Sequence, residues 1–214
     1  MARIVYIQEL EAVRHSLIEM GENTTSLLGE ALHAVAGDGS PDCAERASEL
    51  ESRTDHQLRT IRDQCLSLIT LQAPVARDAR LITGILDAIV DLELIGDYAY
   101  EIVTIGGSMK SRPPSQIMHQ VAEVISKTRA ALSDALDAWR IEEGGPYPPV
   151  DAEVAAIRAE CHILYDKLSQ LASGPGDAMP YVNLMLICRH VERISRHAAC
   201  VAEQAAAAAP ASRV

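Results

Sequence analysis

The chain has 214 residues and a formal net charge of -11 at pH 7. Hydrophobic residues make up 48% of it and charged residues 23%, which supplies enough apolar material for a folded core and argues against disorder. Aromatic residues make up only 3%, so a β-sandwich and a stacking platform for single-stranded nucleic acid are both disfavoured. Because a phosphate backbone is bound by a basic surface, the acidic balance also argues against nucleic acid as a partner.

The sequence predicts a cytoplasmic protein that does not insert into a membrane. No apolar run approaches the roughly 18–20 residues that span a bilayer. Residues 1–6 lead directly into a polar stretch and lack the apolar region and cleavage site of a signal peptide. The 5 cysteines are odd in number and include no C-x-x-C pair, which is typical of reduced thiols rather than of a disulfide framework or a zinc site.

Glycine and proline residues divide the chain into six stretches that favour helix. Each stretch has about 25–35 residues and is rich in Ala, Leu, Glu, Arg and Gln, with no competing two-residue alternation. Ser40, followed by Pro41, and Asp177 are predicted helix caps. The breaks between the stretches fall, in chain order, at residues 37–41, 72–74, 106–114, 144–149 and 173–177.

Long helices joined by short connections form antiparallel bundles, so we predict an all-α fold. Glu93–Ala99 lies near the end of the third stretch, and the related segment Glu192–Ala198 holds the same place in the sixth, 99 positions later. A period of this length indicates duplication of a three-helix unit. We therefore expect two tandem antiparallel three-helix bundles, the first at residues 1–108 and the second at residues 115–209.

Two pairs of acidic residues fall on stripes that should face the core. Glu93 and Asp97 are four residues apart and continue the stripe of the third stretch, whereas Asp87 and Asp91 project to the opposite side and are expected to be solvated. That stripe consists of Ile82, Ile85, Leu86 and Ile89.

Glu51 and Asp55 interrupt the stripe of the second stretch at the same four-residue spacing. The apolar positions of this stripe are Ala44, Ala47, Leu58, Cys65 and Ile69.

Carboxylates that face a core must be paired, protonated or bound to metal, because an isolated buried carboxylate costs several kcal/mol. Two such pairs on adjacent antiparallel helices form a cluster of hard oxygen ligands suited to Mg²⁺, Mn²⁺ or iron. An ion-pair network accounts for the same pattern, because Arg62 projects on the same face of the second stretch. On the residues alone, both interpretations stay open.

The second half carries a weaker version of this pattern. Glu192 matches Glu93, but Arg196 stands in place of the second acid and predicts an internal salt bridge with Glu192. Glu160 is a candidate match for Glu51, yet Leu164 occupies the position of its partner acid. Other catalytic motifs have little support: a single Glu-x-x-His occurs, whereas ferritin-like di-iron bundles need two.

Three segments resemble the PhoU family of phosphate-signalling regulators. Leu71–Arg80 is similar to the family's Gln-Pro-Val-Ala segment followed by Asp-Leu-Arg. Glu93–Asp97 is similar to its Glu-Arg-Ile-Gly-Asp motif, and Glu192–Ala198 to the second copy of that motif. The chain departs from the pattern at Leu94, where the family has Arg, and at Ala79, where it has Leu.

The resemblance implies a non-enzymatic cytoplasmic regulator, peripheral at the inner membrane through its partners. These partners would be a sensor histidine kinase, the ATPase of a phosphate ABC transporter and a second copy of the chain in a homodimer. The alternatives are a metal-dependent enzyme that uses the carboxylate cluster and a purely structural helical adaptor.

The resemblance also implies metal ions, such as Fe, Zn, Mn or Mg, held by paired acids. The family's acidic motifs carry over onto Glu51, Asp55, Glu93 and Asp97, with Glu160 and Glu192 as weaker matches in the second repeat. Because the guanidinium of Arg196 replaces an acid there, we expect one competent acidic site in the first bundle and a weak site, or none, in the second.

Overall fold

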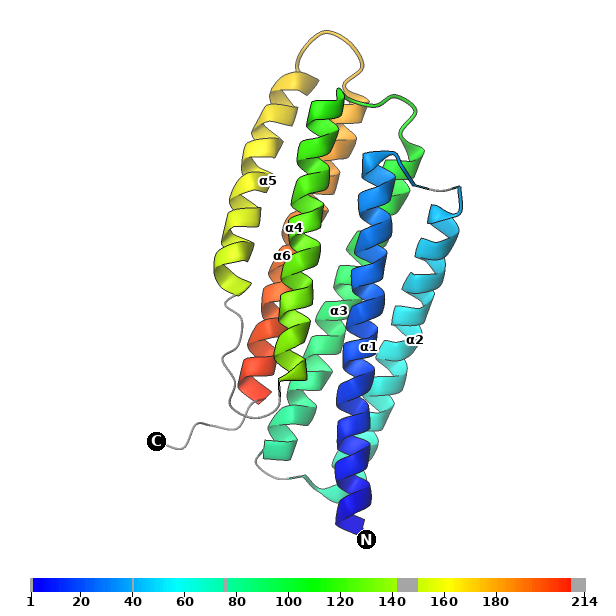
Figure 1. Ribbon diagram of the computed structural model, residues 1–214, viewed down its shortest axis with the longest axis vertical. Helices are drawn as coiled ribbons and strands as arrows, with labels where there is room; N and C mark the ends of the chain where they lie inside the picture. The colour runs from blue at the N-terminus through cyan, green and yellow to red at the C-terminus, as the bar shows by residue number, and fades with distance from the viewer. Residues whose placement is uncertain (1, 40, 75–76, 142–149, 209–214) are drawn as a thin grey trace.

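The computed structural model describes residues 2–39, 41–74, 77–141 and 150–208, and these ranges contain helices and no strand. Figure 1 shows the helices along the long axis of the molecule. They are, in chain order, α1 (Ala2–Ala36), α2 (Cys43–Gln72), α3 (Arg77–Ser108), α4 (Ser115–Arg140), α5 (Val150–Ala172) and α6 (Met179–Ala208). The predicted all-α fold is confirmed.

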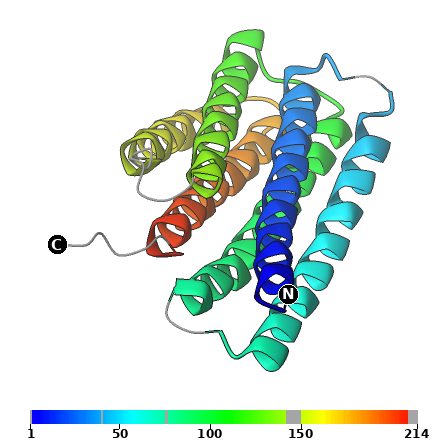
Figure 2. The same ribbon diagram turned by 60° about the horizontal axis from the view of Figure 1, so that its bottom comes forward.

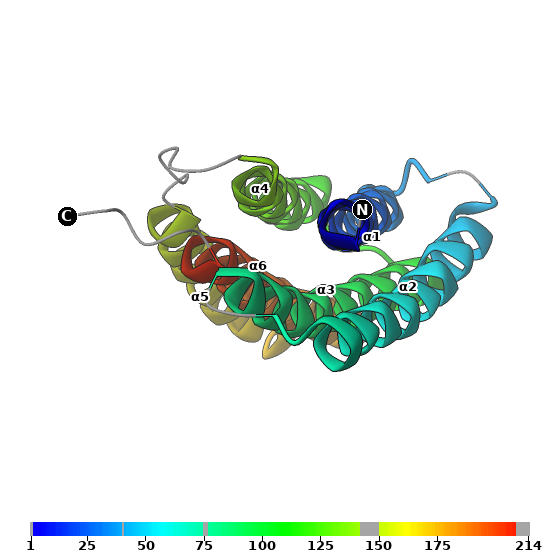
Figure 3. The same cartoon turned by 90° about the horizontal axis from the view of Figure 1, so that it is seen from below.

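Four helices stand side by side in a curved row, in the order α2, α3, α6 and α5 (Figure 3). Helices α1 and α4 cover one side of this row, with α1 packed on α2 and α3, and α4 packed on α5 and α6. Figure 2 shows α2 and α5 at the two edges of the molecule. The chain therefore forms the two predicted three-helix bundles, which join through contacts of α3 with α6 and of α1 with α4.

The limits of the two predicted units, 1–108 and 115–209, remain a prediction, and residue 209 lies outside the described residues. Arg112, in the segment between the bundles, ties that segment to α1. Its guanidinium donates hydrogen bonds to the carbonyl oxygens of Ala34 (3.1 Å) and Val35 (3.0 Å), which lie at the helix end where carbonyls lack partners within the helix. Gly37 has a φ of 81°, and a Cβ there would lie 2.5 Å from Arg112 Nη1, so both the turn and the contact require glycine.

The helix ends follow the punctuation of the sequence closely. Ala73 ends α2 in the left-handed conformation, with a φ of 44°, directly before Pro74. The predicted cap at Asp177 is confirmed, because its carboxylate accepts a hydrogen bond from the backbone N–H of Met179 at 3.0 Å. The predicted cap Ser40 and the predicted break at 144–149 lie outside the described residues.

Helix α3 continues through Gly106, within the third predicted break, to Ser108. A Cβ on Gly106 would lie 3.1 Å from the carbonyl carbon of Ala34, so glycine here allows α1 and α3 to pack with their backbones close together. Gly106 was expected to end the helix, and it instead allows α1 and α3 to pack closely.

The core follows the predicted stripe of α3 but only part of the stripe of α2. Ile82, Ile85 and Ile89 are fully buried, and burial of one such side chain stabilises the fold by about 1.5–3 kcal/mol. In α2, Ala47 and Cys65 are buried and Leu58 is partly buried, whereas Ala44 and Ile69 are exposed. The difference arises because α2 lies at the edge of the row and has neighbours on one side only.

None of the helices in the described ranges combines the length and the apolarity that crossing a bilayer requires.

Candidate metal centre

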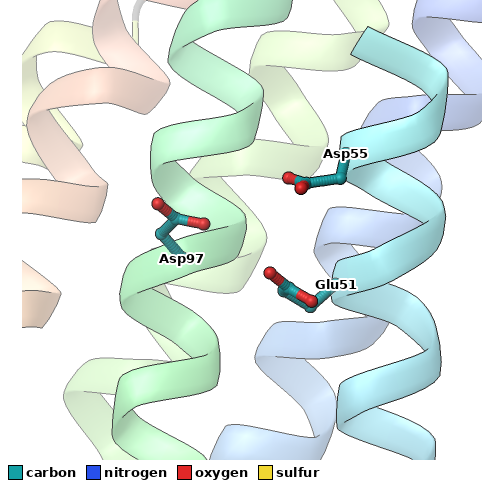
Figure 4. Close-up of side chains that lie close together, drawn as sticks. All are labelled: Glu51, Asp55 and Asp97. Carbon is teal, nitrogen blue, oxygen red and sulfur yellow. The ribbon is translucent and has the colours of Figure 1, made fainter. Parts of the chain in front are cut away.

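Glu51 and Asp55 of α2 and Asp97 of α3 extend into the space between the two helices (Figure 4). One carboxylate oxygen from each residue lies within 4.8 Å of the others. All three side chains are partly buried, at the boundary between core and solvent rather than in the core itself. The structure therefore brings three of the four predicted acids of the first bundle into one group.

The fourth acid, Glu93, lies one helical turn before Asp97 and is also partly buried. It is not part of the group of three oxygens. Its pKa is nevertheless raised above the ordinary value, first by burial and then by the negative charges of Asp97 and Asp55. Glu93 therefore belongs to the same electrostatic cluster.

Thr54 of α2 and Gly96 of α3 face each other directly beside the acids. Thr54 of α2 is buried, and a Cβ added to Gly96 of α3 would lie 3.5 Å from Thr54 Cγ2. A Cβ at this distance would be in ordinary van der Waals contact, so Gly96 and Thr54 pack against each other without a need for glycine. Asp55 and Asp97 each follow one of these residues in the sequence, so the close packing carries both carboxylates into the same space.

The group carries more negative charge than its neighbours compensate. Burial raises the pKa of Asp97, and the charges of Asp55 and Glu101 raise it further. Arg59 forms an ion pair with Asp55 at 3.1 Å, but its side chain is 68% exposed, so this pair is a weak one. Arg62, the partner in the alternative ion-pair interpretation, forms no ion pair with any of the acids among the described residues, although its charge lowers the pKa of Glu93 somewhat.

This donor set fits a hard metal ion. Carboxylate oxygens bind divalent cations such as Mg²⁺ and Ca²⁺ at about 2.0–2.6 Å, so oxygens on opposite sides of one ion lie up to about 5 Å apart. The spread of 4.8 Å within the group is compatible with one shared ion. A bound cation would also balance the negative charge of the group that the exposed Arg59 leaves uncompensated.

The corresponding acids of the second bundle are already neutralised by cations. Both oxygens of Glu160 accept hydrogen bonds from Lys127 Nζ at 2.9 Å. Glu192 is buried and accepts a hydrogen bond from Arg189, and the predicted salt bridge from Arg196 is present at 3.7 Å. Because these carboxylates already bind side-chain cations, they do not fit a metal centre.

Asp91 does not lie on a solvated face, and that prediction is wrong, whereas Asp87 is exposed as expected. The Asp91 side chain is 15% exposed, and its two oxygens lie 2.7 Å from His197 Nδ1 and 2.7 Å from Gln204 Nε2 of α6. The pattern of α3 alone could not reveal this cluster, because its partners come from the other bundle.

The remaining candidate ligands are engaged elsewhere or are neutral. In the Glu-x-x-His segment, Glu30 forms a two-point ion pair with Arg46, whereas His33 pairs with Asp38. All 5 cysteines are free thiols, in agreement with the sequence analysis. Burial raises the pKa of the Cys65 thiol to about 11, so it stays protonated at neutral pH.

Comparison with known proteins supports the resemblance seen in the sequence. The PhoU domain matches residues 17–105, which contain all four acids of the first bundle. The chain is 28% identical over 205 residues to the "Phosphate-specific transport system accessory protein PhoU homolog" of Synechocystis sp., covering 94% of this chain and 90% of that protein. It is 25% identical over 197 residues to the Pseudomonas aeruginosa protein of the same name, covering 91% and 81% of the two.

The predicted resemblance to the PhoU family is confirmed. Two crystal structures share the fold. PhoU from Pseudomonas aeruginosa superposes with a TM-score of 0.72 at 24% identity, covering 94% of this chain and 96% of that one. The phosphate transport system regulatory protein PhoU from Streptococcus pneumoniae superposes with a TM-score of 0.78 at 19% identity, covering 94% of each chain.

Replacing Asp97 by asparagine (D97N) tests the unbalanced negative charge of the acids between α2 and α3 in the absence of metal. A carboxyl whose pKa is raised on folding binds more protons in the folded state, so stability falls as the pH rises through its titration range. In chelator-treated buffer, D97N should raise the free energy of unfolding near pH 7 by a few tenths to about 1 kcal/mol. It should also reduce the loss of stability as the pH rises from about 4, the ordinary pKa of Asp, to about 7.

Urea unfolding at the two pH values measures both effects. The matched control is D87N, which removes an exposed carboxylate of the same helix and should leave stability unchanged. A D97N protein that is less stable than the wild type near pH 7 would show that the acids are not in mutual repulsion.

Proposed function

We propose that this protein is a non-enzymatic regulator of phosphate uptake and phosphate-starvation signalling. The observation that carries the proposal is the similarity, over more than nine-tenths of the chain, to proteins named as accessory proteins of the phosphate-specific transport system. An accessory protein acts by contact with the transport system. The partners we propose are the ATPase of a phosphate ABC transporter and a sensor histidine kinase, on the cytoplasmic side of the membrane.

The proposal includes a homodimer and a metal ion between α2 and α3. Glu51, Asp55 and Asp97 would hold the ion, with Glu93 contributing charge beside them. Iron, zinc, manganese and magnesium are the candidates, and the all-carboxylate donor set favours the harder ions among them. When bound, the ion supplies the positive charge that holds α2 and α3 together at this level, and the residues fix its position.

Metal content tests the proposed centre. After purification without chelator, wild-type protein should retain metal, and D97N should lose it, with affinity at least tenfold weaker because one carboxylate ligand is missing. Glu192→Gln should retain metal, because Glu192 already binds arginine side chains. The D87N control should retain it as well.

Elemental analysis by mass spectrometry and equilibrium dialysis with Mn²⁺ give the two measurements. Equal loss of metal from D97N and Glu192→Gln would refute the assignment of the centre to the first bundle.

Co-purification and a deletion strain test the regulatory function. The tagged protein, expressed from its own locus, should retain the phosphate transporter ATPase, and its deletion should derepress phosphate-starvation genes in phosphate-rich medium. The wild-type gene should restore repression. A metal-dependent enzyme or a structural adaptor predicts neither effect, so normal repression in the deletion strain would contradict the proposal.

A further inference from the structure

Arginine side chains from two helices surround a single buried carboxylate in the second bundle. Arg158 and His162 of α5 approach Glu192 of α6 at 3.7 Å and 4.0 Å. Arg189, one turn before Glu192, donates a hydrogen bond to it, and Arg196, one turn after it, lies at 3.7 Å. We call Arg158, His162, Arg189, Glu192 and Arg196 the arginine cluster.

The arginine cluster holds more positive charge than its carboxylate can balance. Three guanidinium groups face one acid, in a chain whose net charge is -11. The side chain of Glu192 is 10% exposed, whereas those of Arg158, Arg189 and Arg196 are 44%, 54% and 59% exposed. The acid therefore forms the floor of the cluster and the cations form its open side.

Glu192 cannot use most of the hydrogen-bond donors around it. A guanidinium carries five N–H donors in a rigid fork, and a carboxylate has two oxygens. The Nε–H of Arg158 is buried without a hydrogen-bond partner among the described residues, because its distance of 3.7 Å from Glu192 Oε1 is too long for a hydrogen bond. Glu160, the acid of α5 nearby in sequence, is bound by Lys127 through both oxygens.

A hollow of about 290 Å³ opens beside the arginine cluster, between α5 and α6. It is lined by Cys161, His162, Tyr165, Cys188, Arg189 and Glu192. Burial, followed by the charge of Glu192, raises the pKa of the Cys161 thiol to about 12, and burial also raises that of Cys188. Both thiols are therefore neutral, which disfavours a soft-metal site. The charged groups of the hollow are Arg189 and the carboxylate that Arg189 binds, Glu192.

We propose that the arginine cluster binds a tetrahedral oxyanion of the phosphate class. Guanidinium groups bind phosphate oxygens through two parallel hydrogen bonds, and Glu192 holds Arg189 and Arg196 in place before the anion arrives. The two bundles then bind ligands of opposite charge, because three arginine side chains surround the acid of the second bundle, whereas three acids lie together in the first. The proposal depends on α5 and α6 alone and does not rest on the metal centre or the partners proposed above.

Calorimetric titration of the full-length protein with inorganic phosphate, near pH 7.5 and at low salt, tests the site. The variants Arg189→Gln and Arg196→Gln should each bind phosphate at least tenfold more weakly, because each removes a charge-assisted hydrogen-bond donor. Arg80→Gln, which changes an exposed arginine of α3, is the matched control and should bind like wild type. Helix content measured by circular dichroism should be the same in all four proteins.

Two further titrations identify the source of the phosphate group. Tighter binding of phenyl phosphate than of inorganic phosphate assigns the site to a phosphorylated molecule, and the reverse order assigns it to free phosphate. Wild-type protein that gives no heat with either compound overturns the proposal, as does equal affinity in wild type, Arg189→Gln and Arg196→Gln. Tighter binding of a Glu-rich peptide than of either phosphate compound overturns it too. All of these outcomes are independent of whether the first bundle binds metal, so the two proposals can fail separately.

Discussion

In the first bundle, helix packing holds together carboxylates that repel one another, and the account of the site depends on this constraint. Helices α2 and α3 pack together with Thr54 facing Gly96, and Asp55 and Asp97, the next residues along each helix, lie beside Glu51. The pKa values of Asp97 and Glu93 are raised first by burial and then by the negative charges of neighbouring acids, so both effects disfavour the ionised carboxylates. Proteins retain such unfavourable charge at functional sites, where a ligand of opposite charge relieves it.

The two bundles have similar helix arrangements and opposite local charge. In the first, the acids between α2 and α3 outnumber the cations beside them, where Arg59 pairs with Asp55 alone; in the second, Glu192 between α5 and α6 has an excess of cations. The bundles are joined by the contact of α3 with α6, where Asp91 lies within hydrogen-bond distance of His197. Each site therefore includes one of the two helices, α3 or α6, that join the bundles, and a ligand bound at either site would contact the helix pair between them.

The sequence predicted the helices, their breaks and the pairing of acids, because these depend on local punctuation and on periodicity within one helix. It could not show that Asp91 pairs with His197, because the α3–α6 contact joins residues more than 100 positions apart. The burial of Ile69 was misjudged, and the ion-pair alternative with Arg62 was left open, for a related reason. The burial of α2 depends on its place at the edge of the row, which no pattern within the helix reveals.

Anomalous diffraction from crystals grown with Mn²⁺ tests the central claim most directly. The account predicts one peak between α2 and α3, within about 2.6 Å of carboxylate oxygens of Glu51, Asp55 and Asp97. The same account predicts no peak beside Glu192, where arginine side chains fill the role of the metal. A peak beside Glu192 would contradict it. The absence of a peak between α2 and α3, in crystals grown at saturating Mn²⁺, would contradict it too.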